Sequence, residues 1–431
     1  MQRMREDLAS AVEEVHRLAA DGHLWPGWDI SSTPLVFHSP EVAYVVGHPS
    51  PPEGYEEMES VAGRTVHSGR PIPEMVANTA LTIAGNLSAL AMFTSAPLRS
   101  IDGFARLILH ECFHAYHCQG LSRVALPNSM IMSRYPESDP ENNAMSIVEN
   151  RLLCSALRGE EVGVTAAWFV AVRQARHRRL EVEGLADICL YEQGSEFSEG
   201  TPTYVEVRAG KPVSEVIEDL EKANIAGKWA AMRRFYSSGS AIALVLDVLM
   251  PDWHGRLAGG GQTLQSLLAE AVGQPLPDAA QVAKAAGYSE ILASERASER
   301  ERRARIESMY GKLTSGPGVA VEIEVPDGAF TLFDPNNILN VKGGTRFHTH
   351  LTGLRGPRGI VVDITRLCLE DVEPHRLLVR LPEPPQIAQG ESFLLSGPGL
   401  MISAPRAIVD GSGSDGVYRV RFGPFSAAKL R

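Results

Sequence analysis

The stretch LRSIDGFARLILHECFHAYHCQG, residues 98–120, contains two histidines separated by a glutamate and two further residues. On a helix, side chains four residues apart lie on the same face, so His110 and His114 can direct their imidazoles at one metal ion. Glu111 then lies beside the ion, where a carboxylate can accept a proton from metal-bound water. The competing interpretation is an amphipathic helix in which these polar residues have no chemical role.

The residues around this motif favour a helix. Ser100 or Asp102 can cap its N-terminus, and the apolar residues that follow recur at helical spacing. Cys112 lies on the face turned away from the two histidines, where we expect its thiol to pack in the core. His117 follows His110 by seven residues, and we expect it at the surface rather than among the ligands.

The composition is that of a globular protein, because 44% of the 431 residues are hydrophobic and 22% are charged. A formal net charge of −11 argues against binding to nucleic acid or to an anionic membrane, since both require clustered Lys and Arg. No apolar run approaches the length of about 18 residues that could span a membrane, and no signal-peptide pattern is present. The five cysteines form no CxxC pair, which is typical of reduced thiols, and we expect a cytoplasmic protein.

The hydrophobic pattern of the first two thirds of the chain changes from strand-like to helical. Residues 34–47 and 78–95 alternate and predict strands, with a hairpin turn around Gly85–Asn86. From residue 100 to about residue 272 the 3.6-residue period dominates and predicts a helix bundle.

The last third of the chain has a different character. Residues 293–308 predict a charge-dense helix, and the Gly-Pro loop TSGPG, residues 314–318, follows it. From Val319 onward, short alternating stretches broken by Gly and Pro predict an all-β module, either a sandwich or a barrel.

The sequence therefore predicts an α+β fold. Residues 1–97 would form an N-terminal helix and the strand-rich part of a catalytic domain. Residues 98–310 would form its helical metal-binding part, and residues 316–431 the C-terminal β-module.

A catalytic zinc site with two histidines needs a third protein ligand and leaves a fourth position open for water. We expect this ligand to be an acidic residue on a later helix, and the stretch YEQGSEFSEGTPTYVEVRAG, residues 191–210, supplies it. Here we expect Glu199-Gly200 to start a helix that places Tyr204 and Glu206 on later turns.

The segment SEGTPTYVE, residues 198–206, resembles the third-ligand segment of the gluzincin metallopeptidases of the peptidase MA-like clan. The likeness is to the aminopeptidase-N and glycyl-aminopeptidase groups, whose pattern is Glu-Gly, a small or apolar residue and Tyr, with a Glu two residues on. The resemblance implies that His110 and His114 are zinc ligands, that Glu111 is the general base and that Glu199 is the third ligand.

The resemblance covers roughly residues 78–250 and implies a gluzincin-like catalytic domain, a strand layer followed by a mostly helical bundle. Such peptidases bind extended substrate along an edge strand, for which residues 78–93 are the candidate. One departure is the 84 residues between His114 and Glu199, which extra helices must fill. Another is SALAMFTS, residues 88–95, which lacks the Glu-Asn of the family's exopeptidases and so does not support an aminopeptidase.

Four further residues are candidates for the site. Glu196 and Glu206 share a helical face with Glu199 and compete with it, but we expect them instead to orient a ligating histidine. Related gluzincins stabilise the oxyanion with a downstream tyrosine, so the resemblance implies this role for Tyr236, with Tyr204 as its competitor.

Two other polar features have more ordinary interpretations. Glu149 lies in an apolar helix and could contact a ligating histidine, but a structural hydrogen bond or salt bridge is the better explanation. In TRFHTH, residues 345–350, a strand would place His348 and His350 on one face, as in cupin-like metal sites. Only His375 follows, without the Glu-x-His order of such sites, so we expect no second metal site.

We therefore predict a zinc-dependent hydrolase, in its simplest form a metallopeptidase, that acts on a peptide or an amide-containing small molecule. Histidine and carboxylate ligands also suit ferrous iron. One alternative is thus a tailoring enzyme, a zinc hydrolase or an iron oxygenase, acting on a non-peptide or carrier-bound substrate. A second alternative is a non-catalytic binding protein on a degenerate peptidase fold, although the presence of all four chemical groups argues against it.

Overall fold

The computed structural model describes residues 3–118, 131, 134–222, 228–258, 260–329, 337–341, 344–371, 373, 375–411 and 416–422. The chain divides into two compact units, Met1–Glu295 and Arg296–Arg431. The boundary lies within α11 (Tyr288–Ser315), a continuous helix that includes the charge-dense segment expected over 293–308. None of the described helices is long and apolar enough to cross a membrane.

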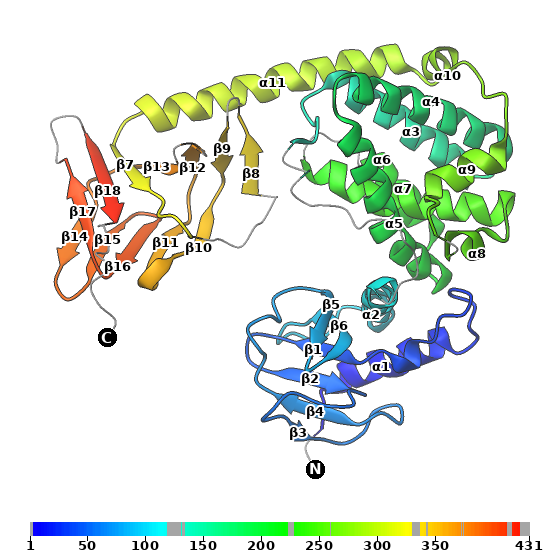
Figure 1. Ribbon diagram of the computed structural model, residues 1–431, viewed down its shortest axis with the longest axis horizontal. Coiled ribbons are helices and arrows are strands. Elements are labelled where there is room, and N and C mark those ends of the chain that lie inside the picture. The colour runs from blue at the N-terminus through cyan, green and yellow to red at the C-terminus, as the bar shows by residue number, and fades with distance from the viewer. Residues whose placement is uncertain are drawn as a thin grey trace. The chain divides into compact units, whose positions relative to one another are not determined.

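The first unit contains a six-stranded sheet in the order β3-β4-β2-β1-β6-β5 (Figure 1). Its strands are β1 (Leu35–His38), β2 (Ala43–Val46), β3 (Glu56–Glu57), β4 (Val66–Gly69), β5 (Thr79–Ile83) and β6 (Asn86–Met92). The predicted hairpin is confirmed, since β5 and β6 pair antiparallel and Ile83 lies opposite Asn86. Ala84 and Gly85 both have positive φ, 42° and 80°, as a two-residue type I′ turn requires. The strand β5 therefore lies at an edge of the sheet.

Ten helices of the first unit precede α11 among the described residues. They are α1 (Glu6–Ala19), α2 (Ile101–Tyr116), α3 (Pro140–Leu157), α4 (Val162–Val182), α5 (Ala186–Arg208), α6 (Val213–Lys222), α7 (Lys228–Leu249), α8 (Trp253–Ala258), α9 (Leu264–Val272) and α10 (Ala279–Ala285). The helix α2 packs against β5, β6 and α5, so it lies between the sheet and the bundle. Of the two expected caps, Ser100 is the one that accepts a hydrogen bond from the Gly103 N–H.

The helices α5 and α7 pack together at two glycines. A Cβ atom on Gly200 would overlap the Gly239 backbone, and one on Gly239 would overlap the carbonyl of Glu196. The two backbones therefore meet at a distance that only glycine permits. This crossing lies directly after Glu199 and three residues after Tyr236, so it sets the separation of these two side chains.

The second unit is a sandwich of two sheets. The sequence predicted either a sandwich or a barrel for this part of the chain. Its sheets have the orders β10-β11-β16-β15-β14 and β17-β18-β7-β13-β12-β9-β8. The strands are β7 (Val319–Glu324), β8 (Ile338–Asn340), β9 (Thr345–His348), β10 (Leu351–Gly356), β11 (Ile360–Ile364), β12 (Cys368–Asp371), β13 (Arg376–Leu381), β14 (Gln386–Gln389), β15 (Phe393–Gly397), β16 (Leu400–Ala404), β17 (Ala407–Asp410) and β18 (Val417–Phe422). Buried residues of both sheets, among them Val321, Leu377, Val362 and Ile402, form one core. The whole fold belongs to the predicted α+β class.

Candidate metal centre

The helix α2 presents the two histidines and the glutamate of the motif at the interface with α5. His110 and Glu111 are each only 5% exposed. Both histidines project toward Glu199 on α5, as the four-residue spacing predicts. The first unit thus brings together three side chains that are separated by as many as 88 intervening residues in the sequence.

The distances among these three side chains fit one metal ion. An oxygen of Glu199 lies 3.4 Å from His114 Nε2 and 3.7 Å from His110 Nε2. Four ligands held tetrahedrally at about 2.0–2.1 Å from zinc are about 3.3 Å apart, so these separations need little adjustment. Among the described residues this is the one group of three whose donor atoms all lie within 4.8 Å of one another.

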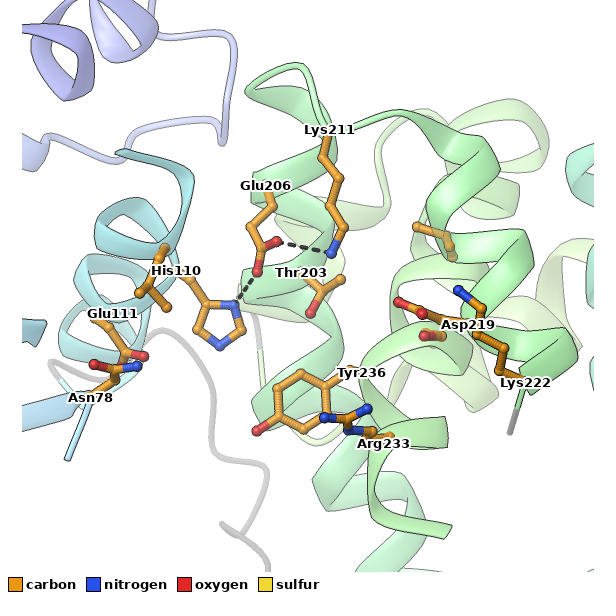
Figure 2. Close-up of a pocket in the computed structure, with 13 residues that line it drawn as sticks. Asn78, His110, Glu111, Thr203, Glu206, Lys211, Asp219, Lys222, Arg233 and Tyr236 are labelled. Atoms are coloured by element: carbon orange, nitrogen blue, oxygen red, sulfur yellow. Dashed lines mark hydrogen bonds and ion pairs between the residues drawn. The ribbon is translucent and has the colours of Figure 1, made fainter. Parts of the chain in front are cut away.

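The outer nitrogen of His110 is held by a second glutamate of α5. His110 Nδ1 lies 2.6 Å from Glu206 Oε1, and the other oxygen of Glu206 accepts a hydrogen bond from Lys211 Nζ at 3.0 Å (Figure 2). A carboxylate accepts, so Nδ1 donates to Glu206, and Nε2 is the nitrogen that a metal would bind on displacing its proton. Glu206, two helical turns after Glu199 on nearly the same face of α5, thus occupies the orienting position expected for it.

Burial and negative charge shape the protonation of this group. Burial disfavours a charged His110, but the carboxylates of Glu199 and Glu206 outweigh it and raise the pKa of His110 to about 9. Burial raises the pKa of Glu199, but the two histidines outweigh this and hold it well below its ordinary range. The pKa of Glu111 is raised, chiefly by burial, and the neighbouring histidines only partly oppose this. The pKa values of His110, Glu111 and Glu199 are thus all perturbed by burial and by neighbouring groups of the site.

Tyr236 lies across the site from α2, one turn before the glycine crossing of α7. Its ring is stacked over that of His110, with centroids 5.9 Å apart and an interplanar angle of 13°. Burial, and then the nearby carboxylate of Glu199, raise the pKa of Tyr236 far above its ordinary value. Its hydroxyl therefore stays protonated at neutral pH and can donate a hydrogen bond into the site. The resemblance implied a donor at this position.

Glu196 and Glu149 do not contact the histidines, contrary to the expectation for Glu196. Arg173 donates to both oxygens of Glu196 at 3.0 Å, and Ser238 Oγ donates to one of them at 2.6 Å. Glu149 accepts from Arg173 at 2.7 Å and from Arg176 at 2.6 Å, which is the salt-bridge alternative. Three residues before Glu199, a helical side chain is rotated by about 60° from it, and this rotation directs Glu196 at α4.

Tyr204 is also directed away from the site. Its hydroxyl donates to the carboxylate of Asp247, with oxygen separations of 3.0 and 3.1 Å, and lies 3.2 Å from His254 Nε2. It follows Glu199 by five residues, which places it on another face of α5. Of the two tyrosines expected to compete, Tyr204 is therefore directed at Asp247, and Tyr236 is the one that lies at the candidate centre.

His117 is buried, although we expected it at the surface. It is only 7% exposed, and its ring stacks on Phe197 of α5. The hydroxyl of Thr201 donates to the carbonyl of Phe197, so His117 Nε2 must donate to Thr201 Oγ1 at 2.9 Å. The seven-residue spacing predicts that His117 and His110 lie on the same face of the helix. The sequence pattern does not reveal that α5 covers this face. Cys112 is fully buried, as expected for a core thiol.

The histidines of the β-sandwich share a glutamate that the sequence did not single out. His348 Nε2 lies 2.6 Å and His375 Nε2 lies 2.9 Å from the carboxylate of Glu370, which also accepts from Arg346. His350 instead lies 2.8 Å from the Asn337 amide nitrogen. No sequence motif marks Glu370. It lies on β12, which pairs with the strand of His348 so that Cys368 is opposite His348.

Two cavities border the candidate metal centre. The larger, of about 800 Å³, is lined by Asn78, Leu107, His110, Glu111, Thr203, Glu206, Lys211, Val216, Asp219, Lys222, Arg233, Tyr236 and Ser237. The smaller, of about 270 Å³, is lined by Asn78, Thr79, Ala80, His110, Glu111, His114, His117, Cys118, Ser198, Glu199 and Tyr236. His110, Glu111 and Tyr236 line both, so the centre lies where the two cavities meet. The basic residues of the larger cavity were not recognised from the sequence, since no motif marks them.

The comparisons with known proteins do not extend these observations. No family model, no curated protein and no solved structure matches the chain. The function is therefore inferred from the geometry of the centre itself.

Proposed function

We propose that this protein is a metal-dependent hydrolase of amide bonds, a metallopeptidase of gluzincin type that uses zinc. The observation that carries this proposal is the convergence of His110, His114 and Glu199 around one point, with Glu111 beside them. Two neutral imidazoles and one carboxylate form a donor set suited to catalytic zinc, with a position left open.

A zinc ion held there would polarise the amide carbonyl and lower the pKa of a bound water. The side chains around the zinc position hold and transfer the protons of the reaction. Glu111 is buried next to both histidines, and its raised pKa makes it a better proton acceptor than an ordinary glutamate. It takes the proton of the attacking water and passes it to the leaving amine. Glu206 holds His110 in the tautomer that coordination requires.

Tyr236 supplies the hydrogen-bond donor for the oxyanion. Its hydroxyl is kept protonated by burial and by Glu199, and it lines both cavities. A donor that is already in place as negative charge develops stabilises the transition state more than the substrate.

The edge strand β5 supplies a surface for an extended substrate. Asn78, Thr79 and Ala80 line the smaller cavity together with His114 and Glu199. Because β5 ends its sheet, one row of its backbone groups is available to pair with an added strand. This arrangement favours a peptide over a compact small molecule.

The experiment is the substitution Glu111→Gln, tested on a peptide mixture with cleavage followed by mass spectrometry. The variant should bind one equivalent of zinc like the wild type and lose roughly 10²–10⁴-fold in turnover, because the proton acceptor is gone. Loss of zinc together with activity would make Glu111 structural. Undiminished turnover would contradict the proposal, as would oxygen consumption by the iron-loaded wild type in place of hydrolysis, since this donor set also suits ferrous iron.

A further inference from the structure

The β-sandwich unit has a cavity of its own, which we call the sandwich cavity. It has a volume of about 550 Å³ and shares no lining residue with the metal centre. Its volume lies within the range of sites that bind small molecules. Three of the residues that line it are basic, Lys312, Arg366 and Arg380, and none is acidic. The positive charge of this lining is therefore not neutralised by a carboxylate within it.

Arg380 is the one basic residue of the three whose donors are mostly used. Its guanidinium donates to the carbonyls of Leu313 at 2.7 Å, Thr314 at 2.8 Å, Gly316 at 2.8 Å and Gly318 at 3.1 Å. The first two carbonyls lie in the last turn of α11, at the negative end of the helix dipole. Since Arg380 covers these oxygens, they do not repel an anion in the cavity.

Arg366 is held in place with most of its donors unused. Its Nη1 donates to the carbonyl of Pro398 at 3.0 Å, and its stem packs on Gly399, where an added Cβ would lie 3.3 Å from Arg366 Cδ. A guanidinium has five N–H groups, so four remain for a ligand. No ion pair connects Arg366 with a carboxylate of the described residues. The cavity therefore contains a positioned guanidinium whose charge is unpaired.

Lys312 adds a second unpaired charge from another element. It lies in the last turn of α11 and is exposed. Within the described part of the chain, its ammonium has neither an ion pair nor a hydrogen bond. An exposed ammonium alone would select no ligand, but Lys312 lines the same cavity as Arg366. Two cations from separate elements can thus act on one anion.

The rest of the lining is apolar. It consists of Leu313, Pro317, Leu367, Leu381 and Pro382, together with Gly318. Leu313 is 5% exposed and Leu381 is fully buried, so part of the wall belongs to the core of the unit. Apolar walls strengthen the interaction of a ligand with nearby charges and can cover a hydrocarbon group. The cavity is therefore suited to a ligand that has both an anionic group and an apolar body.

We infer that the sandwich cavity binds a small organic anion, a carboxylate or phosphate ester that carries an apolar chain. Arg366 donates to the anionic oxygens in charge-assisted hydrogen bonds, Lys312 adds its charge, and the leucine and proline side chains cover the chain. This site is independent of the proposed function, because it uses no residue of the metal centre. It makes the C-terminal unit a ligand-binding module.

The test measures the affinity of the full-length protein for four probes by isothermal titration calorimetry. Octanoate or octyl phosphate should bind at least about tenfold more tightly than octanol, because hydrogen bonds to charged groups contribute about 1.5–3 kcal/mol. Either of the two should also bind at least about tenfold more tightly than acetate, which lacks the chain. The tighter of the two eight-carbon anions identifies the anionic group. Equal affinity for octanol and both anions would overturn the inference.

Reversal of charge assigns the binding to this cavity. Arg366→Glu should weaken binding of the preferred anion at least about tenfold. The matched control is Arg376→Glu, which alters an exposed arginine of β13 that does not line the cavity, and it should bind like the wild type. Zinc also binds carboxylates, so an affinity that Arg366→Glu leaves unchanged would place the anion elsewhere and overturn the assignment.

A second variant keeps the test valid if Arg366→Glu does not fold. Lys312 is exposed and makes no contact that holds the fold, so Lys312→Glu should leave the unfolding temperature of the β-sandwich unchanged. It should still weaken binding of the anion several-fold, because it replaces an attractive charge by a repulsive one. Wild-type affinity in Lys312→Glu would contradict the role given to the second cation.

Discussion

Glu196 and Glu206 lie on the same helix, ten residues apart, and the sequence assigns both to the same role. Their carboxylates have different partners, because Glu196 meets Arg173 of α4 whereas Glu206 meets His110 of α2. Helical spacing predicts which face of α5 each residue occupies, but not which helix covers that face. The role of each glutamate therefore depends on packing that the sequence pattern does not contain.

Substitution of Glu206 should change zinc affinity, whereas substitution of Glu196 should change the unfolding free energy. Glu206→Gln should lower zinc affinity by roughly 10–100-fold and leave the unfolding free energy nearly unchanged, since it weakens the support of one ligand. Glu196→Gln should cost about 3–5 kcal/mol of unfolding free energy and leave zinc affinity unchanged, because it removes one of the two carboxylates that neutralise the buried Arg173, and the other, Glu149, is shared with Arg176. Competition with a zinc chelator and urea unfolding measure the two quantities. The reverse pattern would exchange their roles.

Tyr236 and Tyr204 form a second matched pair. Tyr236→Phe should lower kcat roughly 10²–10³-fold with a smaller change in KM, because it removes a donor to the transition state. Tyr204→Phe should keep kcat and cost about 1–2 kcal/mol of stability through the lost hydrogen bond to Asp247. Steady-state kinetics on one cleaved peptide compares them. Equal losses of kcat in both variants would disprove the assigned donor.

At the scale of elements, the two helices that hold the ligands could be predicted, and their crossing could not. The helical period of residues 101–116 and the spacing of the motif were enough to place His110, Glu111 and His114 on α2. An acidic residue on a later helix was expected from the ligand count, and the resemblance singled out Glu199-Gly200. The expectation that this pair starts a helix was wrong, because α5 begins at Ala186. The structure requires glycine at position 200 because Gly200 contacts Gly239. Gly239 lies 39 positions later, and no local sequence pattern connects the two.

Gly200→Ala should therefore damage the site without altering any ligand. The added methyl group would force α5 and α7 apart, which should cost about 1–3 kcal/mol or more and lower turnover by moving Glu199 relative to Tyr236. Gly163→Ala in α4 is the control, since the nearest atom to its added Cβ is 4.0 Å away. The control should be neutral or stabilise the protein by up to about 1 kcal/mol. Equal behaviour of the two variants in thermal unfolding and turnover would contradict this account.

At the scale of the whole molecule, the two largest hydrophobic cores among the described residues are separate. One is made of residues of the first unit and the other of the β-sandwich. The change of hydrophobic pattern after residue 318 predicted the second core, because strands and helices have different periods. The pattern could not decide between a sandwich and a barrel, which depends on how distant strands such as β7 and β18 pair.

Because the cores are separate, calorimetry should resolve two unfolding transitions. Excess zinc should raise only the transition of the first unit, by mass action on its folded state. Removal of zinc with a chelator should lower the unfolding temperature of the first unit again and leave that of the sandwich unchanged. A zinc-dependent shift of the sandwich transition would place metal outside the proposed centre.

The sandwich should respond to acid through Glu370. Burial opposes its ionisation, but His348 and Arg346 outweigh burial and lower the pKa of Glu370 from 4.5 to about 2. A carboxylate with a lowered pKa stabilises the folded state above pH 4.5, and this stabilisation is lost as the pH falls toward 2. At about 1.4 kcal/mol per pH unit, it amounts to about 3 kcal/mol. The gap in stability between wild type and Glu370→Gln should therefore narrow from pH 7 to pH 3, and a gap that widens in acid would contradict the assignment.

The central claim is that His110, His114 and Glu199 bind one catalytic metal ion. A crystal grown with one equivalent of zinc and measured at the zinc absorption edge tests it most directly. The account predicts a single strong anomalous peak at about 2.0–2.1 Å from Nε2 of both histidines and from an oxygen of Glu199, with Glu111 and Tyr236 beside it. No peak at this position, or a peak held by other side chains, would contradict the account.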